Sequence, residues 1–132
     1  MIGPPGLRSP TSQLKEQRMS NGIIFLLILA ALVAAFGQLM FKYGADTGGG
    51  IMAILLNPYT MTGLASYFLS MILWLKALTA APLHVVYPFT LLTFVLVGLA
   101  SVAILGERPT SMSLIGWGVI CAGIGVVYLG AR

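Results

Sequence analysis

Four long stretches without charged residues divide the chain, and short charged or turn-forming segments separate them. A helix that spans the hydrocarbon core of a bilayer needs about 20 predominantly apolar residues. The four uncharged stretches contain 23, 29, 30 and 23 residues, so each is long enough to cross a membrane. The pattern therefore predicts an all-α integral membrane protein with four transmembrane helices, at residues 22–43, 59–78, 82–105 and 113–130.

Turn-forming residues mark the connections between these helices. Loop 45–50 ends in three successive glycines, which favour a flexible connection. The apolar run 51–56 is too short to span, so it either lies at the membrane interface or forms the first turn of the next helix. Pro82 begins the third helix, because proline is tolerated in a first turn. The short turn 106–110 makes the third and fourth helices an antiparallel hairpin.

The first 20 residues differ from the rest, being polar and rich in proline and glycine. We interpret them as a flexible tail that precedes a four-helix transmembrane domain at residues 21–132. Lys and Arg are more frequent in the cytoplasmic loops of membrane proteins. Five of them fall on the side of the N-terminus and two on the other, which favours cytoplasmic termini. The five are Arg8, Lys15, Arg18, Lys76 and Arg132, and the two are Lys42 and Arg108.

Composition supports the membrane interpretation and excludes several classes of function. Hydrophobic residues make up 58% of the chain and charged residues 8%, and the mean hydropathy is +0.98. Soluble proteins carry about 25% charged residues, so an ordinary soluble enzyme is excluded. The net charge of +4 comes from dispersed residues, which argues against nucleic-acid binding. The sequence has no cluster of metal ligands, nucleophile triad or phosphate loop, so we expect neither metal nor cofactor.

The first predicted helix carries one polar stripe, formed by Ala31, Ala35, Gln38 and Lys42 at helical spacing. Polar side chains in hydrocarbon are costly and usually face the bundle interior. Lys42 could hold a phosphate as a point charge, and Gln38 could add hydrogen-bond donors. Alternatively, Lys42 extends to the lipid headgroups and Gln38 bonds a neighbouring helix. Both interpretations stay open at this stage.

The other helices offer small and hydroxyl-bearing positions. On the second helix, Ser66 and Ser70 share a face with Gly63 and Trp74, a pattern typical of helix packing in membranes. We interpret Trp74, close to Lys76, as a residue that anchors the second helix at the membrane interface.

On the third helix, Tyr87 and Thr90 flank Pro88, which can kink the helix. A kink beside a tyrosine and a threonine suits either a gated lumen or a static bend. On the fourth helix, Gly116 and Gly123 lie seven residues apart and permit close approach of backbones, which predicts a dimer interface.

Several motifs together resemble the small multidrug resistance family and its relatives in the drug/metabolite transporter superfamily. The resemblance covers about residues 21–132 and implies a small four-helix transporter that works as a dimer. The motifs are GQLMFK (37–42), VVYPF (85–89), GER (106–108) and GWGVICAG (116–123).

One departure from the family pattern indicates which branch of the superfamily the chain resembles. Drug exporters of this family carry a glutamate three residues before the glycine that matches Gly37, and this chain has Ala34 there. The motifs look closer to the Arn-type subunits, which also lack the glutamate. That branch implies a flippase, or flippase subunit, that translocates a polyprenyl-phosphate-linked sugar across the bacterial inner membrane by alternating access.

The resemblance also implies partners and roles for the candidate residues. The expected partners are the lipid-linked sugar, membrane lipids, and a second copy or a homologous small four-helix subunit, with no nucleic acid. Gln38 and Lys42 would bind the phosphate, and the sugar path would be lined by Ser66, Ser70, Tyr87 and Thr90. Two alternatives remain: a small-molecule exporter of the same superfamily, and a membrane scaffold subunit for a glycosyltransferase that does not itself transport.

Overall fold

The computed structural model describes residues 21–130, and the tail predicted at residues 1–20 lies outside them. Four helices are long and apolar enough to cross a membrane, which confirms the predicted all-helical, four-span architecture. The elements are α2 (Asn21–Asp46), α3 (Ile51–Leu55), α4 (Pro58–Leu78), α5 (Leu83–Val86), the 3-10 turn η1 (Tyr87–Phe89), α6 (Thr90–Leu105) and α7 (Ser111–Gly130).

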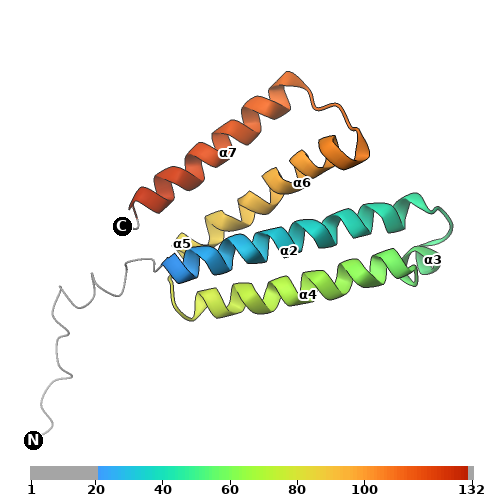
Figure 1. Ribbon diagram of the computed structural model, residues 1–132, viewed down its shortest axis with the longest axis horizontal. Coiled ribbons are helices and arrows are strands. Elements are labelled where there is room, and N and C mark those ends of the chain that lie inside the picture. The colour runs from blue at the N-terminus through green and yellow to red at the C-terminus, as the bar shows by residue number, and fades with distance from the viewer. Residues whose placement is uncertain (1–20, 131–132) are drawn as a thin grey trace, which may run out of the picture.

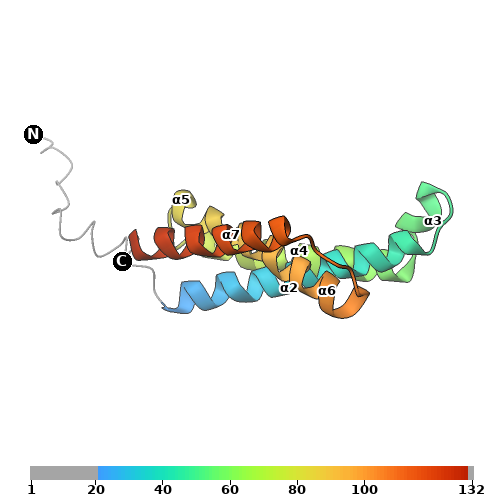
Figure 2. The same ribbon diagram turned by 90° about the horizontal axis from the view of Figure 1, so that it is seen from above.

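The long helices lie side by side in the order α4, α2, α6, α7 (Figure 1). Consecutive spans connected by short turns run antiparallel, so α2 pairs with α4 and α6 pairs with α7. The first span therefore occupies the middle of the row and contacts both α4 and α6. Seen from above, the long helices form a thin layer with α3 projecting at one end (Figure 2).

The backbones of α2 and α4 approach each other closely where two glycines meet. A Cβ added at Gly63 would lie 2.8 Å from the carbonyl oxygen of Gly37, and one added at Gly37 would lie 2.9 Å from that of Gly63. Real Cβ atoms essentially never come so close to another heavy atom, so only glycine allows this backbone approach. Close contact of backbones through small residues is the usual way in which helices associate in lipid.

Local signals in the sequence set the ends of α4 and α6. Asn57 precedes α4, and its side-chain oxygen accepts a hydrogen bond of 2.9 Å from the backbone N–H of Tyr59. Pro58 then occupies the first position of the helix, where its missing N–H costs nothing. Gly106 ends α6 in the left-handed conformation at φ 70°, which suits glycine. These signals begin the second span and end the third.

The third span is interrupted near its start. Residues 83–86 are α-helical, the backbone tightens into the 3-10 turn at Tyr87–Phe89, and the α-helix resumes at Thr90. Pro88 lies inside that turn and has no N–H to donate to the preceding helical turn. Tyr87 and Thr90, on either side of this turn's proline, line a cavity together with residues of α2 and α4.

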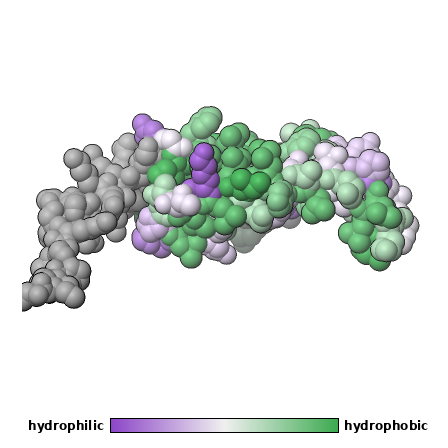
Figure 3. All heavy atoms as spheres, turned by 90° about the horizontal axis from the view of Figure 1, so that it is seen from below, coloured by the Kyte–Doolittle hydropathy of each residue, from purple (hydrophilic) through white to green (hydrophobic). Residues whose placement is uncertain are grey.

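Two elements leave much of their apolar surface uncovered within one chain. Every residue of α7 is exposed or only partly buried. Most of the short segment at residues 51–56 forms a separate helix, α3, on which Ile51, Met52 and Leu55 are exposed. In the space-filling view, hydrophobic residues cover the middle of the visible face and hydrophilic ones lie toward its two ends (Figure 3). This distribution fits a protein whose middle faces lipid tails.

Candidate functional site

A cavity of about 450 Å³ lies between α2, α4 and the segment η1–α6. The α2 side of the cavity is formed mostly by alanines, whose small side chains leave the space open. The α4 and α6 sides carry larger aromatic and hydroxyl-bearing residues. The lining consists of Leu27, Ala30, Ala31, Ala34, Gln38, Tyr67, Ser70, Met71, Trp74, Tyr87, Phe89, Thr90, Thr93, Phe94 and Val97.

The chemical character of this cavity is apolar with a few uncharged polar groups. Five aromatic side chains and six aliphatic ones, counting methionine, share the lining with one amide and three hydroxyl-bearing aliphatic residues. None of the lining residues carries a charge, and none of the described residues forms a cluster able to hold a metal. Apolar walls with a few convergent polar groups are typical of sites that bind small organic molecules.

Four of the six predicted substrate-binding residues line this cavity. Gln38 of α2, Ser70 of α4, Tyr87 of η1 and Thr90 of α6 all line it. Ser66 does not line the cavity: its Cβ is 3.4 Å from where a Cβ on Gly37 would be, so it belongs to the contact between α2 and α4. The roles of these residues in binding stay predictions.

Two of the hydroxyl groups are already engaged with the backbone. The Ser70 hydroxyl is buried and donates a hydrogen bond of 2.7 Å to the carbonyl oxygen of Ala30 on α2. The Thr90 hydroxyl donates to the carbonyl oxygen of Tyr87, which also accepts the backbone N–H of Thr90. Both bonds help to fix the walls of the cavity, and Ser70 also joins α4 to α2.

Replacing Ser70 by alanine tests how much that interhelical bond contributes. Hydrogen bonds between transmembrane helices contribute on average about 0.6 kcal/mol. We therefore expect Ser70→Ala to lower the free energy of unfolding in detergent by about 0.5–1 kcal/mol, as measured by denaturant titration followed by circular dichroism. Thr62→Ala is the matched control, since Thr62 is exposed and bonds only within its own helix. Equal losses in both variants would contradict a special role for Ser70.

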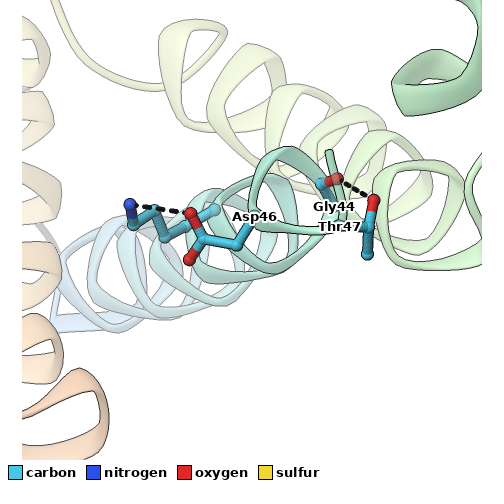
Figure 4. Close-up of polar contacts among 4 residues, drawn as sticks. Gly44, Asp46 and Thr47 are labelled. Atoms are coloured by element: carbon cyan, nitrogen blue, oxygen red, sulfur yellow. Dashed lines mark hydrogen bonds and ion pairs between the residues drawn. The ribbon is translucent and has the colours of Figure 1, made fainter. Parts of the chain in front are cut away.

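Lys42 lies one helical turn beyond Gln38 and outside the cavity lining. Its Nζ is 3.0 Å from a carboxylate oxygen of Asp46, and the two side chains are 47% and 54% exposed. Figure 4 shows this pair at the end of α2, together with the Thr47 hydroxyl that donates to the carbonyl of Gly44. Exposed ion pairs four residues apart contribute only about 0.3–0.5 kcal/mol, so another anion could readily replace Asp46 as the partner of Lys42.

Sequence reasoning did not identify every residue of the site. Trp74, interpreted as an interfacial anchor, lines the cavity, as do Tyr67 and Thr93. The signal for Trp74 was present, because it lies one turn after Ser70 on the same face of α4. Gly98 shares a face with Thr90 in sequence but packs against the Trp117 ring of α7 instead.

The two glycines predicted to form a dimer interface have open space around them. A Cβ added at Gly116 or Gly123 would meet nothing within 4 Å. Both residues are exposed on α7, which packs mainly against α6 and also contacts η1. The assignment of this helix to an interface between subunits stays a prediction.

Four apolar spans and an uncharged cavity between three of them define a multi-pass membrane protein with a cavity inside its helical layer. Comparison with known protein families identifies the family within this class: the model of the EamA-like transporter family matches residues 53–129. The chain belongs to the EamA-like transporter family, which confirms the resemblance to the drug/metabolite transporter superfamily and excludes an enzyme family.

Curated relatives narrow the comparison to one branch. The chain is 38% identical over 102 residues to a probable 4-amino-4-deoxy-L-arabinose-phosphoundecaprenol flippase subunit ArnE from Yersinia pestis, covering 75% of this chain and 90% of the relative. The relative of the same name from Erwinia tasmaniensis is 32% identical over 107 residues, covering 79% and 94%. The resemblance to the Arn-type branch is thereby confirmed. No solved structure matches the chain.

Proposed function

We propose that this chain is one subunit of a flippase that moves undecaprenyl phosphate carrying 4-amino-4-deoxy-L-arabinose across the bacterial inner membrane. The observation that carries the proposal is the uncharged cavity between α2, α4 and α6, in a chain whose relatives are named as subunits of such a flippase. The cavity would hold the sugar, and the polyprenyl chain would remain in the bilayer. Alternating access of the cavity to the two membrane surfaces would then move the headgroup.

The electrostatics of the site suggest where the phosphate lies. A phosphate in an apolar cavity without a cation would be costly to desolvate. Lys42 is the cation one turn away from Gln38, at one end of the cavity lining along α2. We therefore place the phosphate at the Gln38–Lys42 end and the sugar deeper, among Ser70, Tyr87 and Thr90. In this arrangement Lys42 exchanges the Asp46 carboxylate for the phosphate.

This placement predicts different outcomes for substitutions of the two members of the ion pair, Lys42 and Asp46. We expect Lys42→Gln to slow flipping by about tenfold or more, because a hydrogen bond to a charged group contributes about 1.5–3 kcal/mol. Asp46→Asn frees Lys42 and should leave the rate unchanged or raise it. Lys76→Gln, which removes a cation that does not line the cavity, is the control for net charge. Equal losses in the Lys42 and Asp46 variants would show that the pair serves structure instead of binding.

Headgroup movement can be measured directly because the sugar carries an amino group. Purified protein is reconstituted, alone and with its partner subunit, into liposomes containing the aminoarabinose lipid on both leaflets. A membrane-impermeant amine-reactive reagent then modifies only headgroups on the outer surface. Flipping predicts modification of more than half of the lipid over time, whereas protein-free liposomes should stop at the outer half.

The partner would complete the structure at α7. This helix exposes its glycine positions, Gly116 and Gly123, and has few contacts within its own chain. We propose that it packs against the corresponding helix of a second copy or of a homologous small four-helix subunit, with the termini of the chain in the cytoplasm. Small residues at this spacing allow the two backbones to approach closely.

A further inference from the structure

The cavity has an aromatic wall but no acidic residue. Trp74, Tyr67, Tyr87 and Phe94 line it, and none of its lining residues is an aspartate or a glutamate. Among the described acids, Asp46 is paired with Lys42, and Glu107 lies in the turn after α6. A positively charged group that enters the cavity therefore finds π-systems and hydroxyl oxygens instead of carboxylates.

Trp74 lines the cavity with carbon atoms of its indole ring. Its Nε1 atom is buried and has no hydrogen-bond partner among residues 21–130, so the N–H group is out of reach of a molecule in the cavity. The same ring packs against the buried cluster of Leu27, Ala77, Val86 and Phe89. The indole is thus held in position by its neighbours before a ligand binds. Binding therefore costs less conformational entropy than it would with a mobile side chain.

We propose that the aromatic wall around Trp74 recognises the amino group of the sugar through cation–π attraction, which makes Trp74 a specificity-determining residue. The inference rests on the proposed function, because that function supplies the amino sugar. An aliphatic amine is protonated at neutral pH, and tryptophan is the best aromatic partner for such a cation. The hydroxyl oxygen of Thr90 keeps lone pairs that can accept from the same ammonium group.

The test compares two lipids that differ in one substituent: undecaprenyl phosphate carrying 4-amino-4-deoxy-L-arabinose, and its counterpart with a hydroxyl group in place of the amine. Affinities of the full-length chain with its partner subunit are measured by native mass spectrometry. A cation–π contact is stronger in a desolvated site than at an exposed one, so we expect Trp74→Leu to weaken binding of the amino lipid about tenfold, which corresponds to about 1.4 kcal/mol. Binding of the hydroxyl lipid should change less than about twofold.

Two further variants separate recognition from packing. Trp74→Phe keeps an aromatic ring and should retain an intermediate preference for the amino lipid. Trp117→Leu removes the other tryptophan, which packs against Gly98, and should leave the preference unchanged. Equal weakening of both lipids by Trp74→Leu would overturn the inference while the proposed function stands. If the unmodified protein bound neither lipid, the proposed function and the inference would both fall.

Discussion

Replacing Thr93 by tryptophan is expected to reduce flipping at least tenfold while the protein still folds and inserts. Thr93 lines the cavity from α6 and is partly buried, so an indole at this position would occupy much of the space proposed for the sugar. The loss should appear in the liposome assay as modification that stops near the outer half of the lipid. Circular dichroism and size-exclusion chromatography would check that the variant remains helical and homogeneous.

The matched control for this variant is Leu99→Trp on the same helix. Leu99 is exposed and does not line the cavity, so a large ring there would face lipid. This control should flip at close to the unmodified rate. Normal flipping by Thr93→Trp, with the fold intact, would show that the headgroup crosses the membrane by another route.

Replacing Gly63 by leucine is expected to disrupt the fold itself. A Cβ at this position would lie 2.8 Å from the Gly37 carbonyl oxygen and 2.8 Å from the Phe41 ring. Overpacking costs about 1–3 kcal/mol and occasionally more where side chains can move. Here a backbone oxygen is the obstacle, so α4 must separate from α2 along the crossing. We expect a loss of about 3 kcal/mol or more in the free energy of unfolding and a low yield of folded protein.

Gly123→Leu distinguishes this packing from contact between subunits. Gly123 has open space around it within one chain, so the larger side chain should leave the fold of the chain intact. If α7 forms the interface with the partner, the same change should reduce the fraction of paired subunits measured by crosslinking. A variant that folds and pairs normally would contradict the assignment of α7 to that interface.

The four spans could be predicted from the positions of the charges because the thickness of the bilayer imposes a minimum length on every apolar helix. The break at Pro88 could also be predicted from the sequence, because a proline inside a helix removes a backbone hydrogen bond. Helical spacing also predicted the faces of α2 and α4 that carry Gln38 and Ser70, and in the structure both residues line the same cavity. Each of these features depends on local chemistry or on a single periodicity.

Features that depend on how helices cross could not be predicted. Helical periodicity gives the face of a residue but not its depth, so Lys42 shares a stripe with Gln38 yet lies outside the cavity lining. Small residues occur on several helices, and the sequence does not show that the backbones of α2 and α4 meet at Gly37 and Gly63. Trp74 met the rule for interfacial anchors. Its spacing from Ser70 puts both residues on one face of α4, but the sequence does not show that this face lines a cavity together with α2 and α6.

The most direct test of the cavity assignment uses protection by the substrate. Cys121 is the only cysteine, so Cys121→Ser gives a background in which single cysteines can be placed at Thr93, in the cavity, or at Ser113, on the exposed start of α7. Each variant, with its partner subunit, is labelled with a maleimide with and without excess aminoarabinose lipid. The account predicts that the lipid slows labelling at position 93 and leaves labelling at position 113 unchanged. Equal rates of labelling at position 93 with and without the lipid would contradict the assignment of the cavity as the headgroup site.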